Sequence, residues 1–281
     1  MVRALEDSIV WLDWIAHSML VDRHVFARVG GKASNLAILR HRSDELARAA
    51  GKPVYIPNGF VVTPDWNPEE PSDVEAITDA YTSLYRGYNT TNLQVAIRSS
   101  ATCEDSDKHS FAGQFKSVMP VSGLEDLTRS VTEVRASLDG RGVRAYMQDA
   151  HVDPSTVKMA VVVQRYVPAY LAGVIFTSWR GDNDLMHCGF HYGVGEELVS
   201  GNVTAISVGF RKSIRSMALD FPQGTKIPAG ANPEDDIKGS GIFDVAKAIE
   251  EIFDRPQDIE FVADDKLDLH ITQARPITTP T

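Results

Sequence analysis

The stretch that decides the fold stands near the end of the sequence, at Asp258-Ile259-Glu260-Phe261-Val262-Ala263 and Leu269-His270-Ile271-Thr272-Gln273-Ala274-Arg275-Pro276-Ile277. The two runs have the pattern of a β-hairpin. If its loop is the four residues 265–268, Glu260 lies opposite Gln273 and Asp258 lies opposite Arg275. Because side chains alternate between the two faces of a strand, these four polar groups then share one face.

This polar face has the chemistry of a metal site. A carboxylate beside an amide oxygen makes a hard, oxygen-only site that suits Mg²⁺ carrying the phosphates of a nucleotide, and Arg275 would lie near the same phosphates. A solvated hairpin face is the alternative. Val262 and Ile271, which the same register places on this face, indicate partial burial and therefore favour the site.

The rest of the chain predicts a mixed order of helices and strands. The predicted helices run from Gly30-Gly31 to Gly51 and over 74–85, 124–138 and 245–253, the third with Ser122 as its cap. The predicted strands lie within 56–63 and at 93–97, 159–167, 173–177 and 203–210. We therefore expect an α+β protein of two lobes with a cleft between them, divided into 1–154 and 155–281 at Asp153-Pro154-Ser155.

The composition limits the classes of function. The 281 residues are 43% hydrophobic and 23% charged, which is enough for two lobes with a core. A net charge of −10 argues against a nucleic-acid partner, and an acidic protein that binds a polyanion must gather its positive charge in one cleft. Two cysteines cannot build a disulfide framework or a four-cysteine zinc site. Charged residues interrupt the apolar N-terminus and no apolar run could span a membrane, so we expect a soluble, cytoplasmic protein without a membrane partner.

Gly30-Gly31-Lys32 stands at the start of a predicted helix. Glycines let the backbone approach a ligand, the free N–H groups of a first helical turn attract phosphate, and Lys32 would add positive charge. The motif is not a Walker A loop, because Phe26 occupies the position of its first glycine and Ala33 replaces the Ser or Thr that would hold Mg²⁺. On these letters alone, a glycine turn followed by an exposed lysine is the better explanation.

Three further segments have chemistry that suits a nucleotide. Arg98 follows the predicted inner strand 93–97, where its guanidinium suits phosphate or carboxylate, although an ion pair with Glu104 or Asp105 explains it equally well. Small residues surround a glycine in segment 110–115, which suits a mobile lid over phosphates or an ordinary surface turn. Segment 161–167 would present an apolar wall and backbone groups to a purine, although apolar strands are usually core.

Taken in order, these motifs resemble the ATP-binding domain of the phosphoenolpyruvate synthase and pyruvate phosphate dikinase family. The resemblance runs from about residue 28 to residue 277. It is carried by Gly-Gly-Lys-Ala-Ser-Asn-Leu (30–36), Ile-Pro-Asn-Gly-Phe-Val-Val-Thr (56–63), Ala-Ile-Arg-Ser-Ser-Ala-Thr-Cys-Glu-Asp (96–105), Ser-Phe-Ala-Gly-Gln (110–114), Val-Val-Gln-Arg-Tyr-Val (162–167), Ala-Gly-Val-Ile-Phe-Thr (172–177), Gly-Val-Gly-Glu-Glu-Leu-Val-Ser-Gly (193–201), Asp-Ile-Glu-Phe (258–261) and Gln-Ala-Arg-Pro-Ile (273–277).

This resemblance implies an ATP-grasp-like fold with the nucleotide between its two lobes, and ATP and Mg²⁺ as cofactors. The implied contacts are Lys32, Arg98 and Arg275 to the phosphates, Glu260 and Gln273 to Mg²⁺, Gly113 in the lid, Gln164 and Tyr166 to adenine through their backbones, and Glu196 near the ribose. Catalysis is implied for Lys32, Arg98 and Arg275, with Arg98 stabilising the charge on the transferring group.

The sequence also departs from the family pattern. Lys116-Ser117 follow Gly-Gln-Phe where an acidic residue and threonine are common, and Lys108 and His109 precede Ser110. No segment resembles the family's phosphohistidine domain or its phosphoenolpyruvate/pyruvate barrel. We therefore expect a kinase that passes the γ-phosphate of ATP to a small-molecule hydroxyl or nitrogen acceptor, with Lys108, His109 and Lys116 as candidates for acceptor binding or catalysis. The alternatives are a subunit of a split dikinase that phosphorylates a histidine on a separate carrier protein, and a nucleotide-sensing module without turnover.

Overall fold

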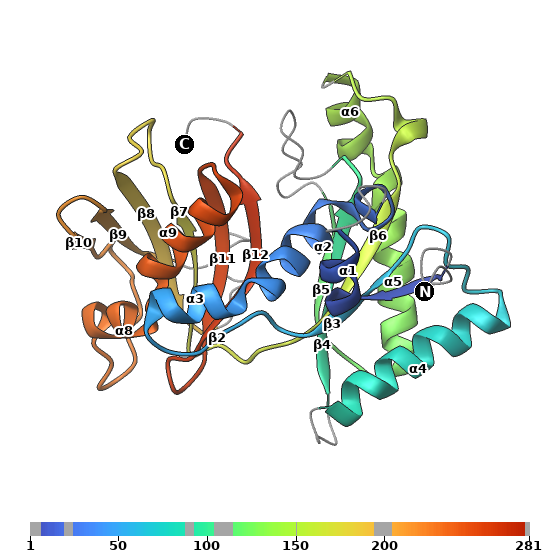
Figure 1. Ribbon diagram of the computed structural model, residues 1–281, viewed down its shortest axis with the longest axis horizontal. Coiled ribbons are helices and arrows are strands. Elements are labelled where there is room, and N and C mark those ends of the chain that lie inside the picture. The colour runs from blue at the N-terminus through green and yellow to red at the C-terminus, as the bar shows by residue number, and fades with distance from the viewer. Residues whose placement is uncertain are drawn as a thin grey trace. The chain divides into compact units, whose positions relative to one another are not determined.

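The computed structural model describes residues 7–19, 25–87, 93–103, 115–149, 151–193 and 204–278. The chain forms two units (Figure 1), unit 1 from Met1–His41 and Pro57–Tyr166, and unit 2 from Arg42–Ile56 and Val167–Thr281. This grouping differs from the predicted division into 1–154 and 155–281. One reason is that segment 42–56 contributes a strand to the sheet of unit 2, and the other is that the strand at 159–165 pairs within unit 1.

Unit 1 is built around a five-stranded antiparallel sheet with the order β1-β3-β6-β4-β5. Its strands are β1 (Ile9–Trp11), β3 (Gly59–Val62), β4 (Gln94–Ala101), β5 (Ser117–Ser122) and β6 (Met159–Arg165). Its helices are α1 (Leu12–Met19), α2 (Phe26–His41), α4 (Pro71–Gly87), α5 (Leu124–Ala136) and α6 (Arg141–Asp149), with short 3-10 turns at Ser137–Asp139 and Pro154–Thr156.

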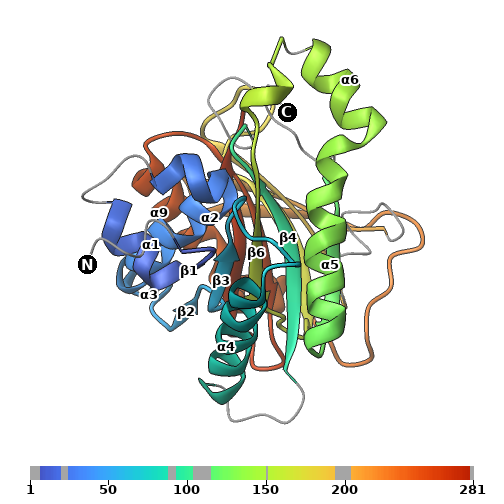
Figure 2. The same ribbon diagram turned by 90° about the vertical axis from the view of Figure 1, so that its right-hand side faces the viewer.

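The two faces of this sheet have different partners. Alternate residues such as Ile97 and Val163 join one apolar core with Ile77 of α4 and Leu127 of α5. Helix α2 packs on the other side of β4 and β6, with α1 beside it (Figure 2). Because side chains alternate, Arg98 lies on the α2 face of the sheet.

Unit 2 contains a seven-stranded sheet with the order β10-β9-β8-β7-β11-β12-β2. Its strands are β2 (Val54–Tyr55), β7 (Leu171–Phe176), β8 (Leu185–Tyr192), β9 (Ile206–Arg211), β10 (Ser216–Asp220), β11 (Gln257–Ala263) and β12 (Leu269–Pro276). Neighbouring strands are antiparallel except β12 and β2, which are parallel. Its helices are α3 (Ser43–Ala50), α8 (Pro233–Ser240) and α9 (Ile242–Phe253).

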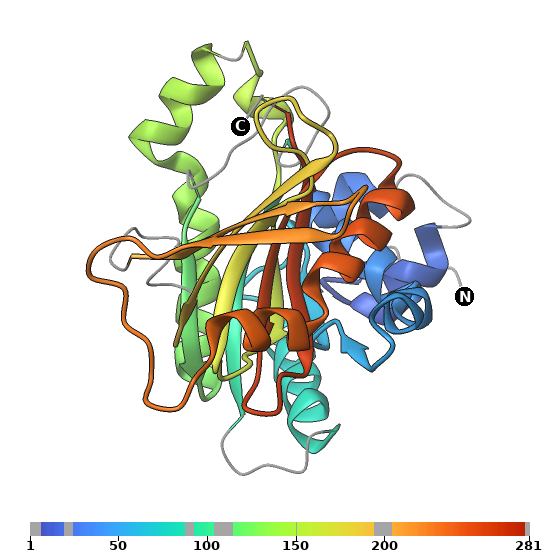
Figure 3. The same ribbon diagram turned by 90° about the vertical axis from the view of Figure 1, so that its left-hand side faces the viewer.

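One face of this second sheet is covered by α9, which packs against β11 and α3 (Figure 3). Phe243 of α9 stacks on Phe210 of β9 with ring centroids 4.4 Å apart. Ile175 and Ile259 occupy the same face and are completely buried. Because side chains alternate along β7 and β11, the opposite face carries Asp258 and Glu260.

The α+β class is confirmed, and two units of sheet and helix agree with an ATP-grasp-like organisation. Helices α4, α5 and α9 confirm the predicted helices at 74–85, 124–138 and 245–253. The predicted cap at Ser122 is wrong, because Ser122 ends β5 and Gly123, with φ 84°, is the N-cap of α5. None of the described helices combines the length and apolar character needed to cross a bilayer.

Candidate functional site

The terminal hairpin has the predicted pairing at its polar positions. Glu260 lies opposite Gln273, and Asp258 lies opposite Arg275. Nearer the turn, a bulge shifts the register, so β11 ends at Ala263 and β12 begins at Leu269. The predicted loop 265–268 is therefore too short.

The bulge also corrects one argument for burial of this face. Ile271 pairs with Phe261 and so lies on the α9 face, not beside Glu260 as predicted. Val262 remains on the Glu260 face, where it pairs with His270. Burial does not depend on Ile271, because Gln273 is 4% exposed and Asp258 is 7% exposed.

Asp258 and Arg275 form a buried ion pair on this face. Arg275 donates through Nε and Nη2 to Oδ2 of Asp258, at 2.8 and 2.6 Å. Oδ1 of Asp258 is buried and has no hydrogen-bond partner among the described residues. Burial raises the pKa of Asp258, while Arg275 opposes this shift and the negative charge of Glu260 adds to it. The carboxylate thus holds Arg275 in one orientation and keeps one oxygen for another donor or a cation.

The row of side chains continues across the sheet. Asp258 neighbours Phe176 on β7, which neighbours His187 on β8. In the adjacent row, Glu260 neighbours Val174, which in turn neighbours Gly189. On this face, the acidic and amide groups of β11 and β12 therefore neighbour the apolar side chains of Phe176 and Val174 on β7. The ring of His187 lies next to Phe176.

His187 lies at the aromatic side of this face. Its ring stacks on Trp179 at a centroid distance of 3.9 Å, and Nε2 is 2.9 Å from Oγ of Ser207. Burial lowers the pKa of His187, and the positive charge of Arg180 lowers it further. Both effects favour a neutral ring.

Glu260 and Gln273 fit the chemistry of a Mg²⁺ site. Glu260 is partly buried and lies beside the buried Gln273 amide, so two oxygen ligands face the same side of the sheet. The described ranges contain no group of three or more His, Cys, Asp and Glu side chains placed to hold a metal. One carboxylate with an amide suits Mg²⁺, which completes its shell with water and substrate phosphates.

In unit 1, Gly30 interrupts α2 with φ 76° and ψ 175°, so the regular helix starts after it, as the glycine pair predicted. Ser100 on β4 holds this start, because its Oγ donates to Val29 O at 2.6 Å and accepts from Ala33 N–H at 3.0 Å. A Cβ at Gly30 would lie 2.1 Å from Ser100 O, so the position requires glycine. Lys32 is 5% exposed, so the alternative interpretation of a glycine turn followed by an exposed lysine is wrong.

Arg98 lies inside β4, not past its end as predicted, because β4 continues to Ala101. It is partly buried between Val162 of β6 and Ser117 of β5. Lys32 comes from α2, which packs against β4. The α2 side of the sheet in unit 1 therefore presents two of the predicted phosphate-binding cations.

The two residues predicted to contact adenine lie at the end of β6. Gln164 is buried, pairs with Gly59 and Ala96 on the two neighbouring strands, and donates Nε2 to Pro57 O at 3.2 Å. The N–H of Tyr166 donates to Gln94 O at 2.9 Å. An adenine contact through the Tyr166 N–H would have to replace this bond.

Several predicted residues lie outside the described ranges. They are Gly113 of the lid segment, Glu196, Lys108, His109, Glu104 and Asp105. Lys116 is described and forms an exposed ion pair with Glu133 at 2.6 Å. This ion pair accounts for the charge of Lys116 without a role in binding the phosphoryl acceptor.

The structure adds three residues to the candidate site that the sequence did not single out for it. Asp258 was placed opposite Arg275 but given no role, although its position two residues before Glu260 puts both on one face. Ser100 stands within the motif at 96–105, where only its partners on α2 reveal its role. His187 joins the face through pairing of β8 with β7, for which the sequence had no signal.

The comparisons with known proteins agree with these features. The family described as pyruvate phosphate dikinase, AMP/ATP-binding domain, matches residues 67–226. A rifampicin phosphotransferase of Streptomyces sviceus is 30% identical over 316 residues, which cover 92% of this chain and 35% of the relative. A probable phosphoenolpyruvate synthase of Methanothermobacter thermautotrophicus is 32% identical over 232 residues, which cover 75% of this chain and 34% of the relative.

The chain thus spans about a third of the length of these curated relatives. Among solved structures, an L-amino acid ligase from Bacillus licheniformis is similar at 10% identity with a TM-score of 0.39, over 94% of this chain and 48% of that chain. A D-alanine-D-alanine ligase from Helicobacter pylori has 8% identity and a TM-score of 0.38, over 87% and 56%.

Proposed function

This chain belongs to the family of the pyruvate phosphate dikinase AMP/ATP-binding domain, and from this premise we propose that it is an ATP-dependent phosphotransferase. It moves the γ-phosphate of ATP·Mg²⁺ to a small-molecule hydroxyl or nitrogen acceptor and releases ADP. The observation that carries the proposal is the polar face of the terminal hairpin, where Glu260 and Gln273 lie beside the buried Asp258–Arg275 pair.

Each group on this face has a role in the proposal. Glu260 and Gln273 hold Mg²⁺ by two oxygens, and the phosphates of ATP supply further ligands. Arg275, held by Asp258, presents its guanidinium to the phosphates. Because Arg275 is already oriented by the ion pair, little side-chain entropy is lost when the phosphate binds.

The proposal also assigns Lys32 and Arg98 of unit 1 to the phosphates of ATP, as the family resemblance implies. Arg98 balances the charge that develops on the transferring phosphoryl group. The acceptor atom forms a bond to the γ-phosphorus as the bond to the β-γ bridging oxygen breaks, and the acceptor gives up its proton to a base or to water. Cations and a metal around the phosphates are the main protein contribution that this chemistry needs.

The remaining predicted contacts complete the nucleotide site in this proposal. Gln164 and Tyr166 contact adenine, Glu196 contacts the ribose and Gly113 belongs to the lid. A cytoplasmic location is part of the same proposal, since ATP is the phosphoryl donor.

A second function is suggested by one relative, a protein named as a probable phosphoenolpyruvate synthase. In this alternative one phosphoryl group of ATP is transferred to a histidine on a carrier protein, water accepts the other, and AMP and phosphate are released. The relatives' names suggest rifampicin and pyruvate-derived compounds as the first molecules to test.

The identity of the nucleotide product tests the proposal. The purified protein is incubated with ATP·Mg²⁺ and each acceptor, and the nucleotides and phosphorylated products are separated by chromatography and ³¹P NMR. ADP together with a phosphorylated small molecule supports direct transfer, whereas AMP formed only with a histidine carrier refutes it. ATP binding without turnover with any acceptor would indicate the nucleotide-sensing module.

Matched variants test the assigned face in the same assay. Glu260→Gln removes the carboxylate that holds Mg²⁺ and should abolish turnover. Glu251→Gln removes a similar charge from the exposed side of α9, where it contacts only Lys247 at 3.9 Å among the ion pairs described, and should leave turnover unchanged. Equal activity of the two variants would contradict the proposed metal site.

A further inference from the structure

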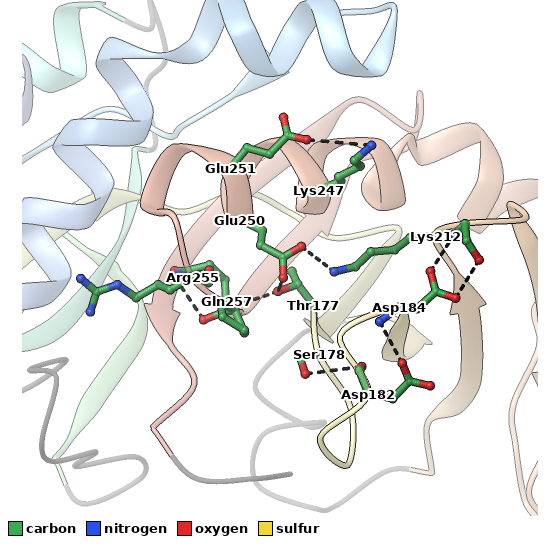
Figure 4. Close-up of polar contacts among 12 residues, drawn as sticks. Thr177, Ser178, Asp182, Asp184, Lys212, Lys247, Glu250, Glu251, Arg255 and Gln257 are labelled. Atoms are coloured by element: carbon green, nitrogen blue, oxygen red, sulfur yellow. Dashed lines mark hydrogen bonds and ion pairs between the residues drawn. The ribbon is translucent and has the colours of Figure 1, made fainter.

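Behind the Asp258–Arg275 pair, on the α9 side of the sheet, one hydrogen-bonded network joins three polar side chains and one main-chain amide from distant parts of unit 2 (Figure 4). Thr177 directly follows β7, Gln257 begins β11, Glu250 belongs to α9 and Lys212 follows β9. Thr177 and Gln257 are completely buried. Burying polar groups costs free energy unless they are paired, so a buried polar network is expected to have a structural role.

The network completes the end of the strand pairing between β7 and β11. Thr177 N–H donates to Gln257 O at 2.9 Å, which continues the antiparallel ladder. The return bond, from Gln257 N–H, ends on the Thr177 hydroxyl at 2.8 Å. In a regular antiparallel pair that bond would end on a main-chain carbonyl. The last hydrogen-bonded pair of this ladder therefore depends on one side chain.

Glu250 fixes the orientation of that hydroxyl. Thr177 Oγ1 donates its single proton to Oε1 of Glu250 at 3.0 Å, so its lone pairs remain to accept from Gln257 N–H. Lys212 Nζ donates to the other carboxylate oxygen of Glu250 at 2.5 Å. The side chains of Lys212 and Glu250 are only 15% and 18% exposed. Their ion pair links α9 to the β9–β10 turn.

This point lies one residue from the proposed nucleotide site. Gln257 precedes Asp258, and Thr177 follows Phe176, the cross-strand neighbour of Asp258. A loosened start of β11 would shift Asp258 first and, through it, Arg275. The network thus lies behind the groups that must meet phosphate and metal, without facing them.

We infer that Thr177 and Glu250 are positioning residues that fix the start of β11, and thereby Asp258, Arg275 and Glu260, for ATP·Mg²⁺. This inference rests on the proposed function. Groups that orient metal and phosphate ligands from behind commonly change affinity by an order of magnitude or more when removed.

The test compares isosteric and conservative changes at Thr177. Thr177→Val keeps the shape but removes the hydroxyl, and should weaken ATP·Mg²⁺ binding about tenfold, whereas Thr177→Ser keeps the hydroxyl and should stay within about twofold of wild type. Thr225→Val is the matched control, since it removes a hydroxyl that donates to Pro222 O at 2.7 Å elsewhere in unit 2. Affinity is measured by calorimetry on the full chain, and hydrogen exchange follows the amides at the start of β11.

Glu250→Ala is a second variant, for use if Thr177→Val folds poorly, because it releases the hydroxyl without removing it. It should weaken binding in the same direction as Thr177→Val. Wild-type affinity in either Thr177→Val or Glu250→Ala, or a Thr177→Ser protein as weak as Thr177→Val, would overturn the inference. Faster exchange at the start of β11 in Thr177→Val but not in Thr177→Ser is the expected structural result, and unchanged exchange would also overturn it.

The two proposals fail in different ways. A wild-type protein that does not bind ATP·Mg²⁺ refutes the proposed function, and the inference fails with it. A wild-type protein that binds, with a Thr177→Val variant that binds equally well, refutes the inference alone.

Discussion

Replacing Arg275 with alanine should destabilise unit 2 strongly, because it leaves the Asp258 carboxylate buried without its partner. Asp258 is 7% exposed, and its Oδ2 receives both hydrogen bonds from Arg275. Removing one partner of a buried ion pair costs about 3–5 kcal/mol in the free energy of unfolding. We expect the lower end of that range at neutral pH, since the carboxyl group of the variant can take up a proton.

The pH dependence of this loss has a definite sign. Burial already raises the pKa of Asp258, and Arg275 opposes the shift, so the pKa rises further in Arg275→Ala. A carboxyl group whose pKa is higher in the folded state binds protons on folding. The destabilisation should therefore shrink as the pH falls toward 3.8, the ordinary value for aspartate.

An exposed pair in the same unit provides the control. Arg215 also donates two hydrogen bonds to one carboxylate, Asp244, at 2.7 and 3.0 Å, but its side chain is 66% exposed. Arg215→Ala should cost less than about 1 kcal/mol, because solvent screens exposed pairs. Hydrogen exchange of β11 and β12 measures the free energy of opening in each variant. Equal losses in the two variants would refute the assignment of Arg275 and Asp258 as a buried pair.

Three other predictions concern the rest of the candidate site. Arg98→Ala should abolish phosphoryl transfer while largely retaining ATP binding, and unchanged turnover in a kinetic assay would refute its role. Gly30→Ala should destabilise unit 1 by more than about 3 kcal/mol, since strain at φ 76° is joined by a Cβ placed 2.1 Å from a main-chain oxygen. Gly51→Ala, at φ 67° with nothing within 4 Å of the added Cβ, should cost only about 1 kcal/mol in thermal or urea unfolding, and equal losses would contradict the steric argument. The pKa of His187 is lowered in the folded state, so the free energy of unfolding should decrease as the pH falls below 6.5 toward that lowered value. His187→Gln should flatten this part of a stability–pH profile. An unchanged profile would show that another group titrates.

The polar half of the hairpin was predictable because its signal is local. Alternation along two strands of fixed period places Glu260 beside Gln273 and Asp258 beside Arg275 once the pairing is known. The loop length was not predictable to one residue, since a bulge changes the register without changing the composition. This is why Ile271 was assigned to the wrong face.

Long-range contacts explain the other differences. The short segment at 54–55 joins unit 2 by parallel pairing with β12, more than two hundred residues away. Arg98 was expected past a strand end because Arg98-Ser99-Ser100 is polar, yet Ser100 is buried by its hydrogen bonds to α2. A polar residue continues a strand when a distant element supplies its partner.

The sequence by itself determined the α+β class, the pairing of the polar hairpin and the family, because each depends on short patterns or on an ordered set of motifs. Only the tertiary structure decided which segments form each unit, how deeply Asp258 is buried, and that Thr177 completes the ladder behind it. The physical reason is that burial and hydrogen-bond partnership belong to pairs of residues far apart in the chain. No local pattern specifies both members of such a pair.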